Sequence, residues 1–162
     1  MQALNSEQVK LLADFNKPFK MWLFTLIKLP SALFMGVKVH RMTTEVGQTS
    51  VPYGWRSQNP FQSIYFAAQC SAGEMSTGLP AMLALKGRGK VSMLVSHIEA
   101  SFVKKATSKT IFTCNDVAAV FETVERAIAT KEAQTIVMTT TGVQATGETV
   151  AVMRVTWSFK AK

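Results

Sequence analysis

The stretch from Asn59 to Pro80, NPFQSIYFAAQCSAGEMSTGLP, constrains the fold more than any other part of the chain. Asn59 is a favourable N-cap, and Pro60 suits the first helical position, where its missing N–H removes no hydrogen bond. Gly78 can adopt the left-handed conformation that ends a helix, and Pro80 should stop any continuation. Apolar residues occupy nearly every side of the segment, which is typical of a buried helix. We therefore predict a central helix over residues 59–78, wrapped by the rest of the chain.

Four residues share one sector of this predicted helix, namely Asn59, Ser63, Cys70 and Glu74. Two interpretations are open. In the first, Ser63 and Cys70 are small so that strands can approach closely, and Glu74 points to solvent. In the second, the sector is a site, because exposed amides at a helix start bind developing negative charge and Glu74 supplies an acid.

The 162 residues predict a single domain, residues 1–162, that is long enough to bury a core. Residues 1–30 form a predicted N-terminal extension of two short helices. The second helix is apolar, but Lys20, Lys28 and Pro30 interrupt it well short of a membrane span, and no signal-peptide pattern is present. It therefore covers one side of the core or forms the lid of a pocket, and contact with a membrane interface is a further alternative.

Most of the remaining chain has the alternation that is typical of strands, with one interruption by an amphipathic helix that follows Asn115 and Asp116. The segment between the first strand and the central helix is rich in turn formers and predicts a loop. This order favours an α+β fold, with a curved, mainly antiparallel sheet around the central helix. The predicted strands cover residues 36–46, 91–103, 107–114, 134–143 and 149–159.

The net charge of +8 raises the question of nucleic-acid binding. The cations are spread along the chain and match no nucleic-acid-binding motif, so we expect a small polyanionic ligand such as the phosphates of coenzyme A instead. Cys70 and Cys114 have no CxxC spacing, which predicts two free thiols in a reducing cytoplasm. His40 and His97 are too few and too far apart to indicate a metal site.

The motif NPxxSxYFAAQxxAxExxTG, with a strand and loop before it and strands after it, resembles the hot-dog fold. More specifically, residues 30–160 are similar to PaaI-like acyl-CoA thioesterase relatives. The resemblance implies a homodimer whose sheets join edge to edge, or a dimer of such dimers. It also implies that amides at the helix start polarise a thioester carbonyl while a carboxylate further along the helix, often from the other subunit, activates water or attacks.

By position, the resemblance assigns the helix-start role to Gln62 and Ser63, with Asn59 beside them. Cys70 then stands where the family has an acidic residue, and Glu74 follows one turn later. Either Glu74 acts from a shifted position or the pocket only binds its ligand. A nucleophilic Cys70, or a base from a strand at His97 or Glu99, is a weaker alternative.

The resulting hypothesis is a cytoplasmic thioesterase that hydrolyses acyl-CoA or another acyl thioester and needs no cofactor beyond the coenzyme A of its substrate. The alternative is a non-catalytic protein that binds acyl-CoA or fatty acyl groups. The candidate residues are Glu74, Ser63 and Asn59 for catalysis, and Gln62, Cys70, Tyr65, Trp55, Arg56 and Arg88 for substrate binding.

Overall fold

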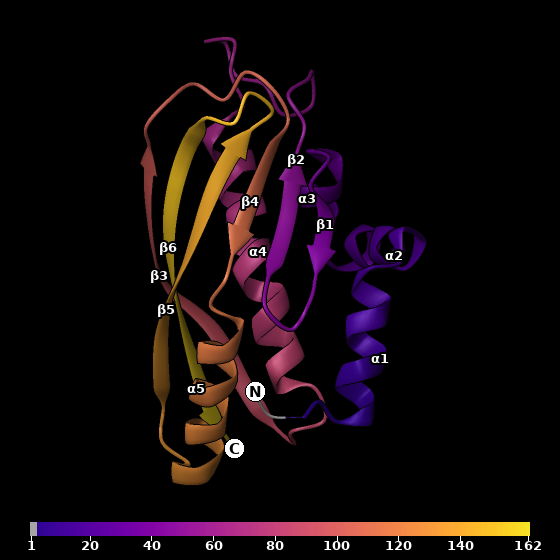
Figure 1. Cartoon of the computed structure of the whole chain (residues 1–162), viewed down its shortest axis with the longest axis vertical. Coiled ribbons are helices and arrows are strands. Elements are labelled where there is room, and N and C mark those ends of the chain that lie inside the picture. Colours follow the sequence, from indigo (N-terminus) through magenta and orange to yellow (C-terminus); the bar gives the residue numbers. More distant parts are fainter. Residues whose placement is uncertain (1–2) are drawn as a thin grey trace.

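Six antiparallel strands form one sheet in the computed structural model, which describes residues 3–162 (Figure 1). The first two residues of the predicted extension 1–30 and of the predicted domain 1–162 lie outside that range. The helices are α1 (Ser6–Phe15), α2 (Pro18–Lys28), α3 (Pro30–Phe34), α4 (Phe66–Leu85) and α5 (Val117–Thr130). The strands are β1 (Lys38–Met42), β2 (Gly47–Val51), β3 (Val91–Phe102), β4 (Thr110–Cys114), β5 (Gln134–Gln144) and β6 (Thr149–Ala161). The predicted α+β class is confirmed.

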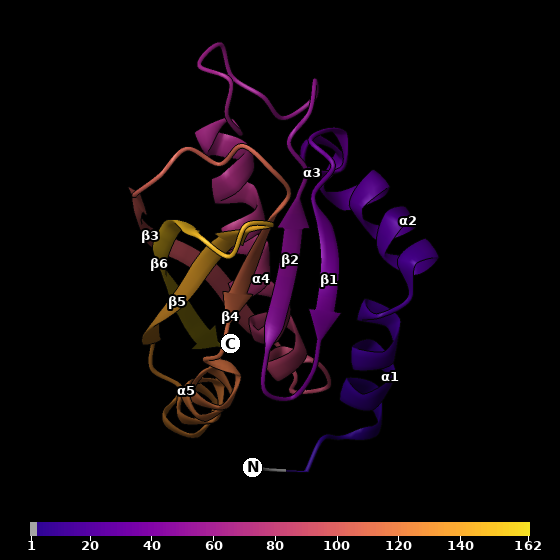
Figure 2. The ribbon, with the colours of Figure 1, turned by 45° about the horizontal axis from the view of Figure 1, so that its top comes forward.

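The strand order β1-β2-β4-β5-β6-β3 leaves β1 and β3 at the two edges of the sheet. Helices α1, α2 and α3 lie beside β1 (Figure 2). No element of the described chain lies beyond β3, whose inner neighbour is β6. One sheet edge is therefore covered by helices, while the other presents the unpaired backbone groups of a long strand.

α4 packs across one face of the sheet and contacts all six strands. Small residues on α4, such as Ala68 and Ala72, let the helix approach the sheet closely, where Phe112 and Met153 complete a fully buried core. α5 lies on the same face and packs against the C-terminal part of α4, with β5 and β6 beneath both helices. This arrangement leaves α4 central, as predicted.

α1 is attached to the C-terminal end of α4. Asn5 caps α1 by accepting a hydrogen bond from the Gln8 N–H at 2.8 Å. The side-chain amide of the buried Gln8 then donates to the carbonyls of Leu83 and Ala84, which belong to the last turn of α4. The last carbonyls of a helix lack the usual donor four residues on, and of these two the Leu83 carbonyl also accepts from the Lys86 N–H. The Gln8 amide therefore satisfies these carbonyls and anchors the N-terminal helices to the core.

The predicted bounds of the central helix are wrong at both ends. The helix begins at Phe66, not at Asn59, and it continues through Gly78 and Pro80 to Leu85. Pro80 cannot donate a hydrogen bond to the Ser76 carbonyl. At that point Gly47 of β2 lies so close that a Cβ on it would clash with the Ser76 oxygen. The helix tolerates Pro80 because the residue of β2 that packs against it, Gly47, has no side chain.

Two elements were not predicted. β2 falls in the segment predicted to be a loop, and its sequence GQTSV lacks apolar alternation. Small and polar residues are required there because β2 faces α4 closely: the buried Thr49 hydroxyl donates to the Ala72 carbonyl at 2.5 Å. The short helix α3 also lies outside the predicted helices. The structure confirms the two predicted N-terminal helices, which are α1 and α2. It also confirms the helix after Asp116 and the C-terminal hairpin.

Candidate functional site

The segment before α4 is a hydrogen-bonded loop and not a helical turn. The Asn59 side-chain oxygen accepts hydrogen bonds from the Phe61 N–H, the Ser63 N–H and the Ser63 hydroxyl, at 3.0 to 3.2 Å. Gln62 adopts a left-handed conformation with φ of 58°. Asn59 therefore organises a turn, which is the alternative use of an asparagine with capping ability.

This loop is held in place by its neighbours. The Ile64 N–H donates to the Ala106 carbonyl at 2.8 Å, and the Tyr65 N–H donates to the Ser57 carbonyl at 2.7 Å. Lys105 donates to the Phe61 carbonyl at 3.1 Å. The basic segment 104–109 therefore lies beside the loop that leads into α4.

α4 begins with free backbone donors. Tyr65 is its N-cap and provides no side-chain cap. The N–H groups of Ala68 and Gln69 both donate to the Tyr65 carbonyl. Within residues 3–162, no acceptor reaches the N–H groups of Phe66 and Ala67. Two amides at the start of a 20-residue helix are thus available to bind negative charge.

The least buried row of α4 consists of Phe66, Cys70 and Glu74, which follow at intervals of four residues and lead to the buried Gly78. The Phe66 ring is 54% exposed and packs edge-on against Phe102 of β3, with ring centroids 6.3 Å apart. The row therefore borders the open β3 edge. Of the predicted sector, Cys70 and Glu74 share this face, whereas Asn59 and Ser63 lie in the preceding loop.

Glu74 lines a cavity of about 200 Å³. The remaining walls are apolar except for Lys28: α2 contributes Phe24, the residue that follows it contributes Leu29, and the sheet contributes Met93 and Trp157. Gly78 leaves room for the carboxylate along the helix, since a Cβ there would lie 3.4 Å from Oε1 of Glu74. The second N-terminal helix was predicted to cover one side of the core or to form the lid of a pocket. α2 packs on the core through Met21 and Thr25, and its Phe24 and Lys28 line this cavity.

Burial raises the pKa of Glu74 above its ordinary value of 4.5. Among residues 3–162 the carboxylate has no ion-pair partner and accepts no hydrogen bond, although Lys28 lines the same cavity. A partly desolvated, unpaired carboxylate in an apolar cavity is suited to proton transfer. Burial likewise raises the pKa of the Cys70 thiol, which disfavours a thiolate nucleophile.

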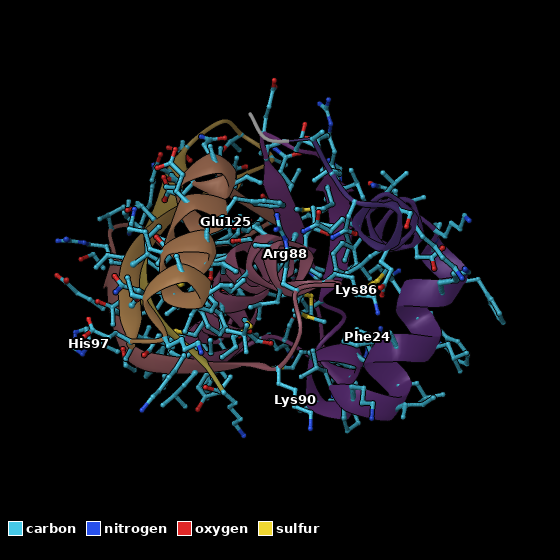
Figure 3. The ribbon with its side chains drawn as sticks, turned by 90° about the horizontal axis from the view of Figure 1, so that it is seen from below. Phe24, Lys86, Arg88, Lys90, His97 and Glu125 are labelled. Carbon is cyan, nitrogen blue, oxygen red and sulfur yellow. The ribbon has the colours of Figure 1, made fainter. Side chains whose placement is uncertain are left out.

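Three of the predicted binding residues lie elsewhere. Trp55 and Arg56 line a shallow depression in the 52–57 loop, where Trp55 is 78% exposed. Arg88 follows the C-terminal end of α4 and forms an ion pair with Glu125 of α5 at 2.5 Å (Figure 3). None of the three borders the Glu74 cavity.

The strand residues considered as bases face away from α4. His97 and Glu99 pair with Thr156 and Arg154 of β6, whereas Ile98 pairs with the buried Val155. His97 lies at the molecular margin opposite Phe24 (Figure 3). The outer face of the sheet therefore carries both residues, and neither can reach the Glu74 cavity.

Lys28, Phe24 and Trp157 were not predicted as site residues. Trp157 is held by a hydrogen bond from its indole N–H to the Thr77 hydroxyl at 2.9 Å, which orients the ring at the cavity. No local pattern signals these contacts, because α2, α4 and β6 are distant in the sequence. The described residues contain no cluster of His, Cys, Asp and Glu that could hold a metal ion, and no helix among them is long and apolar enough to span a membrane.

Comparison with known proteins adds a family and a fold. The sequence pattern of a family described as "domain of unknown function (DUF4442)" matches residues 21–159. No curated protein matches the sequence. Similar solved structures show the same α+β fold at low sequence identity.

The first is a protein of unknown function from Pseudomonas aeruginosa, described as a probable thioesterase, with a TM-score of 0.72, 11% identity and coverage of 99% of this chain and 100% of that one. The second, from Chlorobaculum tepidum and of unknown function, has a TM-score of 0.72, 13% identity and coverage of 90% and 94%. A thioesterase from Haemophilus influenzae has a TM-score of 0.61, 14% identity and coverage of 85% and 87%.

Proposed function

The chain belongs to the DUF4442 family, and we propose that it is a hot-dog-fold hydrolase of acyl thioesters, similar to the PaaI-like thioesterases. Glu74 carries this proposal. It is an unpaired carboxylate on the central helix, its pKa is raised by burial, and it lines an apolar cavity. The thioesterases among the solved structures of similar fold support the same reaction class.

In the proposed reaction, Glu74 takes a proton from a water molecule, and the resulting hydroxide attacks the thioester carbonyl. Free N–H groups at the start of a central helix stabilise the negative charge on the carbonyl oxygen, and each such donor is typically worth about 10²–10³ in rate. The C–S bond then breaks, the thiolate leaves, and the proton held by Glu74 passes to it. The products are a carboxylic acid and a thiol, and no cofactor is consumed.

One protomer cannot bring both its Glu74 carboxylate and the N–H groups at the start of its α4 to the same thioester carbonyl. Glu74 follows Phe66 by eight residues, which is about 12 Å along the helix axis. A dimer joined at the β3 edge removes this difficulty. The open row of α4 borders that edge, so the helix start of one subunit can approach the Glu74 of its partner. We therefore place each site between two subunits, and a dimer of dimers would contain four.

The exposed apolar face beside β3 supports both the dimer and an acyl ligand. Phe66, Phe102 and Ile98 are 43% to 54% exposed there, although Phe102 and Ile98 lie on the same side of the sheet as α4. The cations Lys105 and Lys109 lie in the loop beside the start of α4, where they could bind the phosphates of coenzyme A, whereas the neighbouring Lys104 is paired with Glu148. Two free thiols agree with a cytoplasmic location.

Thiol release from acyl-CoAs of graded chain length tests the proposal. We expect Glu74→Gln to lower kcat by about 100-fold or more, because the base is lost while the shape is kept. Glu99→Gln is the matched control, since its side chain lies on the outer face of the sheet, and it should retain wild-type turnover. Equal turnover in wild type and Glu74→Gln would exclude Glu74 as the base.

The alternative function is binding of an acyl ligand without hydrolysis. The observation that favours it is that Glu74 and Lys28 are the only charged residues that line the cavity within the described chain. In that case no acyl-CoA would be hydrolysed, and titration calorimetry would detect binding that is lost when Met75 or Met82 is replaced by a charged residue.

A further inference from the structure

The outer face of α2 is apolar and exposed. At 100° per residue, five side chains of this helix cover a sector of about 140°, and each is 43% to 73% exposed. They are Phe19, Trp22, Leu23, Leu26 and Ile27. The rings of Phe19 and Trp22 stack with centroids 6.1 Å apart. The opposite side of the helix, with Met21 and Thr25, is buried against the protein.

This face is unpartnered within the protein. α2 forms the outer margin of the molecule on the β1 side, and no described element lies beyond it (Figures 1 and 2). α2 lies beside β1, which is the sheet edge opposite to β3, where we place the dimer (Figure 2). Within the described chain, only the inner side of α2 meets β3, across the Glu74 cavity. A continuous exposed apolar stripe of this size indicates an interaction surface.

The charges around the face identify the partner. Between Asp14 and Glu45 the chain has no acidic residue, yet it carries Lys17, Lys20, Lys28, Lys38 and Arg41. Asp14 forms ion pairs with Lys17 and Lys20, which leaves Lys28, Lys38 and Arg41 without a carboxylate within 4 Å among residues 3–162. Lys20 follows the apolar sector directly around the helix, beside Ile27, and Lys38 lines a groove with Phe19 and Trp22. Lys28 lies on the inner side of the helix with Met21 and Phe24.

We propose that α2 docks the protein onto an anionic lipid bilayer, with its apolar face in the headgroup–acyl boundary and with Lys20 and Lys38 at the phosphates. A short helix with a clean apolar sector, aromatic residues and flanking lysines has the features of an interfacial helix. It is too short to span a bilayer. The inner side of the same helix lines the Glu74 cavity, so docking holds that cavity at the lipid surface.

Vesicle flotation tests this proposal without any reference to hydrolysis. We expect the full chain to float with vesicles of phosphatidylcholine containing 30% phosphatidylglycerol, and to bind vesicles of phosphatidylcholine alone at least tenfold more weakly. Leu23→Ser/Ile27→Ser should reduce binding to the anionic vesicles by about tenfold or more, because these two apolar side chains would insert into the bilayer. Lys38→Gln, which removes a cation that is unpaired within residues 3–162 and lies beside Phe19 and Trp22, should reduce it by about fivefold, and added salt should abolish that difference.

Val9→Ser/Val137→Ser is the matched control. Val9 on α1 and Val137 on β5 are 54% and 45% exposed, so this double variant removes exposed apolar surface elsewhere, and it should float as the wild type does. Equal loss in both double variants would overturn the proposal. So would an absence of flotation, or sedimentation velocity in which Leu23→Ser/Ile27→Ser alone converts an oligomer to a smaller species, which would identify the face as a contact between copies.

Quenching by lipids brominated in the acyl chain gives a second measurement that does not depend on the folding of a variant. Trp22 lies on the proposed face, whereas Trp157 is 4% exposed in the core. In a Trp55→Phe background, we expect the quenched fraction of the fluorescence to be lost on Trp22→Phe. Quenching that persists after this substitution would contradict docking through α2.

Discussion

Glu74 links the stability of the protein to pH as well as its proposed activity. Burial raises the pKa of this carboxyl above 4.5, so the folded state holds the proton more tightly than the unfolded state. The stabilising contribution is therefore fully present below pH 4.5 and is lost as the pH rises through the folded-state pKa. At neutral pH the ionised carboxylate destabilises the fold.

We therefore expect Glu74→Gln to unfold at a higher urea concentration than the wild type at pH 8, with the difference narrowing steadily toward pH 4. Urea unfolding at a series of pH values measures this. Gly54→Ala, which changes no titratable group, is the control, and its difference from wild type should not vary with pH. If the urea midpoints of Glu74→Gln and wild type differed by the same amount at pH 4 and pH 8, ionisation of Glu74 would not destabilise the fold.

The two cysteines should differ in reactivity. Both are free, but Cys70 is only partly buried on the open row of α4, whereas Cys114 is fully buried and its pKa is raised to about 12. We expect one thiol to react slowly with a disulfide reagent in the native protein and two after unfolding. Cys70→Ala should leave no reactive native thiol.

The same labelling reports on the ligand. Cys70 precedes Glu74 by one helical turn, so an acyl chain along the open row of α4 should slow the modification of Cys70 by several-fold. A labelling rate that is unchanged by saturating acyl-CoA would place the ligand elsewhere.

At the scale of elements, the close approach of β2 to α4 makes a specific demand on Gly47. A Cβ at this position would lie 2.9 Å from the Pro80 ring and would also clash with the Ser76 carbonyl. We expect Gly47→Ala to destabilise the protein by about 1–3 kcal/mol, because neither the strand nor the helix backbone can move freely. Gly54→Ala has open space at its Cβ and should be neutral. Urea unfolding compares the two variants, and equal stability would show that the contact relaxes.

Gly47 also explains where sequence reasoning succeeded and where it failed. Elements with clear periodicity, such as α5 and the hairpin of β5 and β6, were predicted from their patterns alone. β2 and the bounds of α4 depend on each other: the strand is small and polar because the helix lies against it, and the helix keeps Pro80 because the strand is small there. Neither signal is local. The capping residue Asn59 and the helix-ending residues Gly78 and Pro80 therefore predicted the wrong bounds for α4.

Only some of the residues at the Glu74 cavity could be singled out from the sequence. Glu74 was singled out as the carboxylate on a mostly apolar helix, and Cys70 because it shares a sector with Glu74 and stands where the resembling family has an acidic residue. Lys28 and Trp157 reach the same cavity from α2 and β6, and only the tertiary fold brings them there. The spacing from the helix start was also misjudged, since Asn59 organises the preceding turn instead of capping the helix.

For the whole molecule, the central question is whether one site needs two subunits. A dimer joined at β3 should dissociate when a charge is placed on its apolar face. We expect Ile98→Lys to convert a dimer into a monomer of 17.8 kDa in sedimentation equilibrium. Turnover should fall in parallel although Glu74 is unchanged, because the amides would no longer be supplied. A fully active monomer would exclude the shared site.

Subunit complementation tests the shared site directly. Phe66→Pro removes the first N–H of α4, and Tyr65 already has the extended conformation that a following proline requires, with φ of −57° and ψ of 136°. Phe66→Ala, which keeps the N–H and loses only the ring, is the control.

We expect Phe66→Pro and Glu74→Gln each to be nearly inactive alone. After the two variants are mixed and allowed to exchange subunits, half of the dimers are mixed, and each mixed dimer has one site with both an intact amide and an intact carboxylate. Activity should therefore return to about a quarter of the wild-type value if dimers exchange at random. If both groups acted within one subunit, mixing would restore nothing, because every subunit would still lack one of them.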